Sequence, residues 1–165
     1  SEIINLEVYN FVTDREMVEK YRIDKIPATV IEGEKDYGIR YYGIPSGYEF
    51  SSLLEDIVDV SRGKVELSEG AREMIRMINK PMHLQVFVTP TCPYCPAAVR
   101  LAHKLAIENE YITADMVEAT EFPHLAMKHN VRGVPRTIIG SDTPLEGALP
   151  EMAFVEKVVE MFKTM

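Results

Sequence analysis

The chain contains an internal repeat, and this repeat limits the possible folds more than any other feature of the sequence. Residues 21–31 resemble residues 129–139, and their prolines align at an offset of 135 − 27 = 108. Residues 3–8 fall against residues 111–116 at the same offset. A repeated segment of this kind indicates two similar folding units within one chain.

Each unit is predicted to contain a strand, a short helix, a second strand, a hairpin strand and a closing helix. In the first unit these elements lie at about residues 2–8, 14–22, 28–32, 37–42 and 47–60. In the second unit they lie at about residues 111–117, 122–129, 136–140, 143–147 and 151–163. After the hairpin the offset falls to 104, which aligns Phe50 with Phe154. A further strand over 84–89 and a helix over 93–108 precede the repeat in the second unit.

The boundary between the units is predicted at residues 61–64, Ser-Arg-Gly-Lys. This places the first unit at 1–62 and the second at 67–165. Ser68 is expected to cap a short amphipathic helix that joins them. Ser46 with Glu49 has the spacing of a capping box at the start of the first closing helix.

Both cysteines lie in one motif, Cys92-Pro93-Tyr94-Cys95, between the apolar residues 84–88 and the helical pattern. That context favours a dithiol redox centre. A structural zinc site needs four ligands, and the chain has no further cysteine and no close pair of histidines. Closing so short a loop also stabilises a fold little, which argues against a purely structural disulfide. Inert or metal-linked cysteines stay open as the alternative.

The position of the motif predicts which sulfur attacks. If the helix begins after Cys92, this residue occupies the N-cap, where free backbone N–H groups stabilise a thiolate. Pro93 then takes the first helical position, which suits proline. Such placement lowers the pKa of a cysteine from about 8.5 to roughly 3.5–7.5. We therefore expect Cys92 to be the nucleophile and Cys95, one turn deeper, the resolving thiol. His103 on the same helix is expected to be solvated.

The motif and its distance to Val134-Pro135, 135 − 92 = 43 residues, resemble the thioredoxin fold, in which that proline is cis and faces the dithiol. The duplication and the wording of residues 89–96, 36–43 and 54–61 resemble a narrower family, the glutaredoxin-like protein disulfide oxidoreductases of thermophilic microbes. These proteins consist of two fused thioredoxin units. The resemblance implies an α/β chain of tandem thioredoxin-like folds, each a mixed sheet flanked by helices.

The resemblance also has consequences for the site. It implies that Val134-Pro135 and Ile26-Pro27 are cis and that the backbone of Val134 pairs with an extended substrate. Pro93 and Tyr94 would position substrate and set the potential. Position 86, where thioredoxins have a buried carboxylate, is Val86. Glu118 is therefore a candidate for proton transfer, and the alternative that it is an exposed carboxylate at a strand end is favoured.

One departure from the family concerns the first unit. Family members have a further strand, helix and CxxC there, and the counterpart of Cys92 would fall before residue 1, so this unit is expected to be truncated. A sheet without a central strand exposes an edge that normally pairs. Another chain, such as a second copy in a homo-oligomer, or a rearrangement is expected to cover it.

Composition narrows the partners. The net charge, 18 − 26 = −8, argues against nucleic acid and anionic membranes. No apolar stretch approaches a membrane helix, and a cytoplasmic location is expected. A single glutamine with frequent Glu and Lys favours a thermophile. No cofactor or metal is expected.

Two functional classes follow. The first is an enzyme that reduces, oxidises or isomerises protein disulfides. By the resemblance, its electrons come from a thioredoxin-reductase-like flavoprotein and pass to proteins such as peroxiredoxins. The second is a redox-inert interaction or assembly module with a vestigial dithiol.

Overall fold

The computed structural model describes residues 3–165. Its elements, in chain order, are α1 (Arg15–Lys20), β1 (Ala28–Glu32), β2 (Asp36–Tyr42), α2 (Glu49–Arg62), α3 (Glu69–Ile75), β3 (Met82–Val88), α4 (Cys95–Glu108), β4 (Ile112–Glu118), α5 (Pro123–Lys128), β5 (Arg136–Ile139), β6 (Thr143–Glu146) and α6 (Glu151–Thr164). The predicted α/β class, a mixed sheet flanked by helices, is confirmed.

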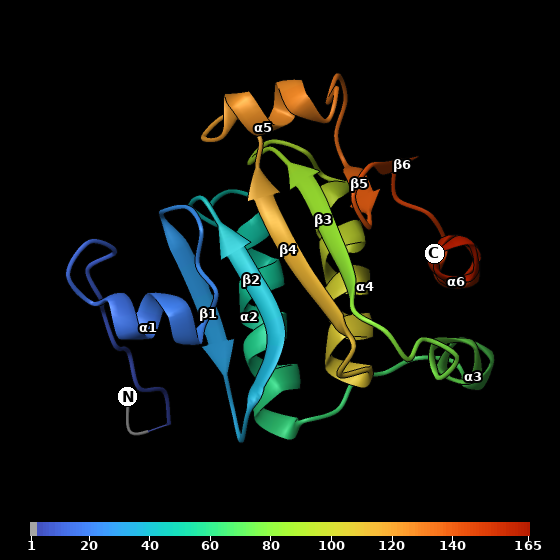
Figure 1. Ribbon diagram of the computed structural model, residues 1–165, viewed down its shortest axis with the longest axis horizontal. Coiled ribbons are helices and arrows are strands. Elements are labelled where there is room, and N and C mark those ends of the chain that lie inside the picture. Colours follow the sequence, from blue (N-terminus) through green and yellow to red (C-terminus); the bar gives the residue numbers. More distant parts are fainter. Residues whose placement is uncertain (1–2) are drawn as a thin grey trace.

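The strands form a single sheet in the order β1-β2-β4-β3-β5-β6 (Figure 1). The pairs β2–β4 and β4–β3 are parallel, and the other pairs are antiparallel. Both halves of the repeat contribute to this sheet, and they join where β2 pairs with β4. The division into units 1–62 and 67–165 stays a prediction, since a continuous sheet crosses it.

The main core lies on one face of the sheet, where Figure 1 shows α2 and α4 behind the strands. Side chains of β3 such as Leu84, Val86 and Val88 point to this face and pack with helices α3, α4 and α6. A smaller cluster on the opposite face joins Phe87 and Val117 to Phe122, at the start of α5. The alternation along β3 follows from the period of two in a strand.

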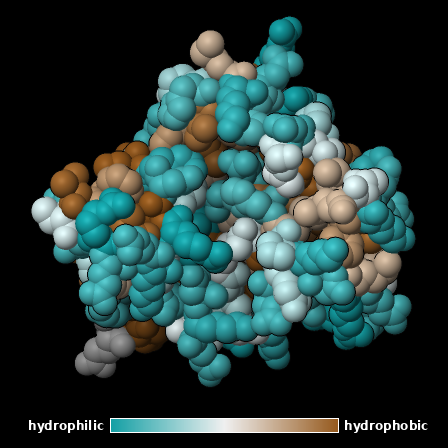
Figure 2. Space-filling view, viewed as in Figure 1, coloured by the Kyte–Doolittle hydropathy of each residue, from teal (hydrophilic) through white to brown (hydrophobic). Residues whose placement is uncertain are grey.

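The centre of that opposite face is polar. Figure 2 shows mainly hydrophilic side chains there, and the polar residues Arg40, His83 and Asp115 line a pocket on it. The first unit also leaves one edge open: within residues 3–165, β1 pairs only with β2.

The predicted strand over residues 2–8 is wrong for its described part. Residues 3–8 are exposed and have no strand structure, and residue 2 lies outside the described residues. The counterpart of this segment in the second unit, β4, pairs with β3 on one side. Strand structure needs a neighbouring strand for its backbone N–H and C=O groups, and no strand of the described sheet pairs with residues 4–8.

The two predicted helix caps have opposite outcomes. The Ser68 hydroxyl accepts a hydrogen bond from the backbone N–H of Ala71, so the cap of α3 is confirmed. The capping box of Ser46 with Glu49 is wrong, because α2 starts at Glu49 after Tyr48, with no side-chain cap. The Glu49 side chain is instead buried against Ser52.

Candidate redox site

The two cysteines form a disulfide at the end of β3. Three loop residues separate Val88 from Cys92, and the Cα atoms of Cys92 and Cys95 are 5.5 Å apart. Cys95 is fully buried, whereas Cys92 is 8% exposed. The sulfur of Cys92 is thus the one nearer to solvent, as an attacking thiol must be.

The helix begins later than expected. α4 starts at Cys95 with Tyr94 as its N-cap, so Cys92 is not the N-cap and Pro93 precedes the helix. Pro96 occupies the first turn, where a missing N–H costs nothing. The expected electrostatic contact is nevertheless present, because the backbone N–H of Cys95 donates to Sγ of Cys92 at 3.1 Å.

The Val134-Pro135 segment lies beside the disulfide. Both Val134-Pro135 and Ile26-Pro27 are cis, as predicted. Sγ of Cys92 is 3.8 Å from the carbonyl oxygen of Val134, across 42 residues of sequence. Pro93 and Tyr94 are exposed next to Cys92, with Tyr94 71% exposed. The structure therefore brings the predicted site residues to one surface.

A buried polar cluster fills the interface between α2 and α4. Asp56 accepts hydrogen bonds from the Tyr41 hydroxyl and from Arg100, and its Oδ2 lies 2.6 Å from Nδ1 of His103. Burial acts to raise the pKa of Asp56, but the charges of His103 and Arg100 outweigh it and hold this pKa below its usual range.

The expectation of a solvated His103 is wrong. Its ring is fully buried, packed edge-on against Tyr41 with ring centroids 5.0 Å apart. The helical pattern placed His103 off the main apolar stripe of α4, but α2 covers that side of the helix with Asp56. A charged residue on a neighbouring helix can bury a polar one, which periodicity within one helix does not report.

Glu49 is a functional candidate that sequence reasoning missed. Its side chain is 1% exposed, and burial raises its pKa to about 7, against the opposing effects of the Ser52 hydrogen bond and the His103 charge. The capping-box pattern assigned Glu49 to the helix surface. Only its position at the packed start of α2 distinguishes it.

Two contacts place Glu49 near the dithiol. The backbone N–H of Tyr48 donates to the carbonyl of Pro90, two residues before Cys92. Asp56 meets Arg100 and His103, so α2 and α4 run side by side in the same direction. Glu49 lies seven residues before Asp56, about 10 Å along the axis, and Cys95 lies eight before His103, about 12 Å. The Glu49 carboxyl is therefore at the level of the first turn of α4.

Glu118 is buried, at 3% exposure, so the favoured interpretation as an exposed carboxylate is wrong. Its oxygens accept from the hydroxyl and the backbone N–H of Thr120. A role in proton transfer stays untested, and the contacts of Glu118 are those of a local turn.

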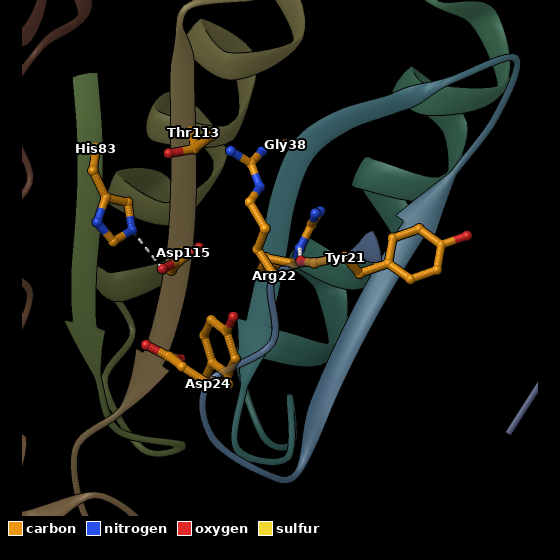
Figure 3. Close-up of a pocket in the computed structure, with 9 residues that line it drawn as sticks. Tyr21, Arg22, Asp24, Gly38, His83, Thr113 and Asp115 are labelled. Atoms are coloured by element: carbon orange, nitrogen blue, oxygen red, sulfur yellow. Dashed lines mark hydrogen bonds and ion pairs between the residues drawn. The ribbon is translucent and has the colours of Figure 1, made fainter. Parts of the chain in front are cut away.

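The pocket on the polar face lies at the other end of β3 (Figure 3). It encloses about 160 Å³, and within it Nε2 of His83 lies 2.6 Å from Oδ2 of Asp115. Arg40 pairs there with Asp36. Because His83 begins β3 and Cys92 follows its end, this pocket is separate from the dithiol.

Neither a metal cluster nor a membrane helix is found among residues 3–165. No group of three or more His, Cys, Asp and Glu residues could hold a metal ion in this part of the chain. No helix among the same residues is both long and apolar enough to cross a membrane.

Comparison with known proteins gives the fold family. Residues 82–160 match the family model of the thioredoxin domain. The fold is thioredoxin-like. The protein disulfide oxidoreductase of Aeropyrum pernix is similar, with a TM-score of 0.84 and 30% identity, over 92% of this chain and 66% of that chain.

The thioredoxin-like chain is also related to AhpF, the F component of alkyl hydroperoxide reductase. A crystal structure of the NTD_N/C domain of AhpF from Enterococcus faecalis matches with a TM-score of 0.81 and 27% identity, over 88% of this chain and 71% of that one. The Staphylococcus epidermidis protein is 30% identical over 105 residues, which are 64% of this chain and 20% of that protein. The chain spans only 20–27% of the length of the curated relatives it matches.

Proposed function

We propose that this protein is a thiol-disulfide oxidoreductase that acts on protein disulfides through Cys92 and Cys95. The observation that carries the proposal is the Cys92–Cys95 disulfide at a strand-to-helix turn, with Sγ of Cys92 beside the Val134 carbonyl. Similarity to the Aeropyrum protein disulfide oxidoreductase supports it.

The reductive cycle moves two electrons from the dithiol to the substrate. The Cys92 thiolate attacks one sulfur of the substrate disulfide, and the other substrate sulfur leaves as a thiolate. Cys95, once deprotonated, attacks Sγ of Cys92 in the mixed disulfide. The second substrate thiolate leaves, and the Cys92–Cys95 disulfide forms.

Glu49 is our candidate for the group that takes the proton of Cys95. It lies at the level of the first turn of α4, and a pKa of about 7 suits exchange with a thiol near neutral pH. In the opposite direction the same carboxyl group would protonate Cys95 as it leaves the broken disulfide.

The remaining site residues would position the substrate. The backbone of Val134, turned outward before Pro135, would pair with an extended substrate segment by strand addition. Pro93 and Tyr94 form the exposed surface beside Cys92, and Tyr94 offers an aromatic face to the segment that follows the substrate cysteine.

Partners are proposed on the same basis. A peroxiredoxin as acceptor and a thioredoxin-reductase-like flavoprotein as donor fit the relationship to AhpF. We also propose a cytoplasmic location and a thermophilic origin, which rest on composition alone.

Insulin reduction with dithiothreitol, compared between the wild type and Cys92→Ser, tests the activity. We expect the variant to lose the acceleration, and equal rates would favour the redox-inert module. Cys95→Ser should trap a mixed disulfide with a substrate protein, whereas Cys92→Ser should not. The reverse pattern would exchange the two roles.

Assembly is the second candidate function, because α2 exposes an apolar stripe next to the open edge of β1. Phe50, Leu54 and Val58 recur every four residues and are about half exposed. We propose that a homo-oligomer covers this stripe and edge. Light scattering should then show an oligomer that Leu54→Glu dissociates. Met127→Glu, on the distant α5, should leave it intact, and a monomeric wild type would exclude this assembly.

A further inference from the structure

Two unpartnered atoms occupy the interface between α2 and α4. Among residues 3–165, three buried side-chain atoms lack a hydrogen-bond partner: Oε2 of Glu49, Nε2 of His103 and Oγ1 of Thr137. An unsatisfied buried polar atom costs roughly 1–3 kcal/mol. Two of them in one interface therefore indicate a place that exchanges a proton or holds one transiently.

Asp56 fixes the direction in which His103 points. It holds the Nδ1 side of the ring, so Nε2 faces away from this carboxylate. The Tyr41 ring packs against the imidazole, and the Tyr41 hydroxyl donates to the same Oδ2 of Asp56. These contacts leave the ring one orientation.

The charges around Glu49 single out His103. From α2, Ser52 and Asp56 act on the carboxyl group, and Tyr41 of β2 is coupled to it. Arg100 is the other cation of the interface, and it is bound by Glu55, Asp56 and Asp59. With Arg100 neutralised in this way, His103 is the cationic group that acts on Glu49.

We propose that His103 is a positioning residue of the redox site, which Asp56 holds toward Glu49 so that it controls when this carboxyl group takes the proton of Cys95. The inference rests on the proposed function. A positive His103 favours the ionised Glu49 that can accept a proton. After the proton has moved from Sγ of Cys95 to Oε2 of Glu49, the Cys95 thiolate is free to attack Cys92.

The test is the reduction potential of the dithiol measured against pH by redox titration. The wild type should show a change of slope near the pKa of Glu49, about 7. His103→Asn keeps an amide donor for Asp56 but has no atom in place of Nε2, and the change of slope should move up by about 1 pH unit. His103→Gln, whose amide reaches the place of Nε2, should move it less.

His83→Asn is the matched control, because it breaks a similar His–Asp pair at the far end of β3 and should leave the change of slope where it is. A folded His103→Asn with an unmoved change of slope would overturn the role of His103. Glu49→Gln should abolish the change of slope. If it persists in Glu49→Gln, the proton-transfer role in the proposed function is wrong, while insulin reduction by the wild type and not Cys92→Ser still establishes the oxidoreductase.

A measurement on the unaltered chain does not depend on the folding of any variant. The imidazole nitrogen resonances of His103, in protein labelled with 15N-histidine, should differ between the disulfide and dithiol forms near pH 7. Identical resonances in both forms would contradict the coupling of His103 to the dithiol.

Discussion

The closing helices α2 and α6 occupy equivalent places in the sequence repeat but bury different faces. Phe154 and Val158 of α6 are 2% and 0% exposed, whereas Phe50 and Leu54, their counterparts at an offset of 104, are 54% and 49% exposed. Conversely, α2 buries the polar Glu49, Ser52 and Asp56. The counterpart of Asp56 is Glu160, which is exposed on α6 and pairs with Lys157.

The difference lies in the neighbours. α6 packs its apolar face into the main core together with α3, so burial there follows the hydrophobic pattern. α2 lies against α4 and meets Arg100 and His103. The first interface stabilises the fold, and the second holds ionisable groups beside the dithiol at a cost in desolvation that hydrogen bonds and charge pairs offset.

Truncation of the two matched phenylalanines should show the largest contrast. Phe154→Ala should lower the free energy of unfolding by about 3–5 kcal/mol, because it leaves a cavity in a closed core. Phe50→Ala should lower it by less than about 1.5 kcal/mol, since half of that side chain is already in solvent. Urea denaturation followed by circular dichroism measures both. Equal losses would mean that α2 is as enclosed as α6 in solution.

Asp56→Asn should be the next most damaging change. It leaves Arg100 and His103 without their shared buried carboxylate, which should cost about 3 kcal/mol. Asp59→Asn is the control, because Asp59 is partly exposed and Arg100 keeps two other carboxylates, and about 1 kcal/mol is expected. If the two variants unfold at the same urea concentration, the interface is not organised around Asp56.

Glu49 should make stability depend on pH. Its pKa rises from an ordinary 4.5 to about 7 on folding. Between these values the unfolded chain releases the proton while the folded chain keeps it, so stability should fall by about 2–3 kcal/mol from pH 4.5 to 7 and change little above. Glu49→Gln should remove this fall from the denaturation curves of the oxidised protein. An unchanged pH profile would place the ionisation elsewhere.

The smallest effect concerns the helix caps. Ser68 caps α3 and also donates to Glu151 at the start of α6, so Ser68→Ala should cost about 1 kcal/mol. Ser46→Ala should have almost no effect on stability, because the Ser46 side chain caps no helix. Thermal unfolding of both variants distinguishes these outcomes, and a loss at Ser46 would restore the capping box.

Much of the fold was predictable because it depends on local patterns. Alternation and helical spacing placed β1, β2 and β3 and the helices from α2 to α6 to within a few residues. The start of α4 was misplaced by the choice of Pro93 over Pro96 as the first-turn proline, which spacing alone does not decide. The strand at residues 3–8 failed because strand structure requires a neighbour that a single segment cannot supply.

The sequence by itself determined where the sulfur chemistry lies, because the cysteines are three positions apart in one turn and the following helix pattern orients them. Only the tertiary structure decided which ionisable groups stand behind that turn. Glu49 and His103 lie 54 residues apart and became candidates when α2 packed against α4, since burial, charge and pKa depend on the facing element and not on the pattern of their own.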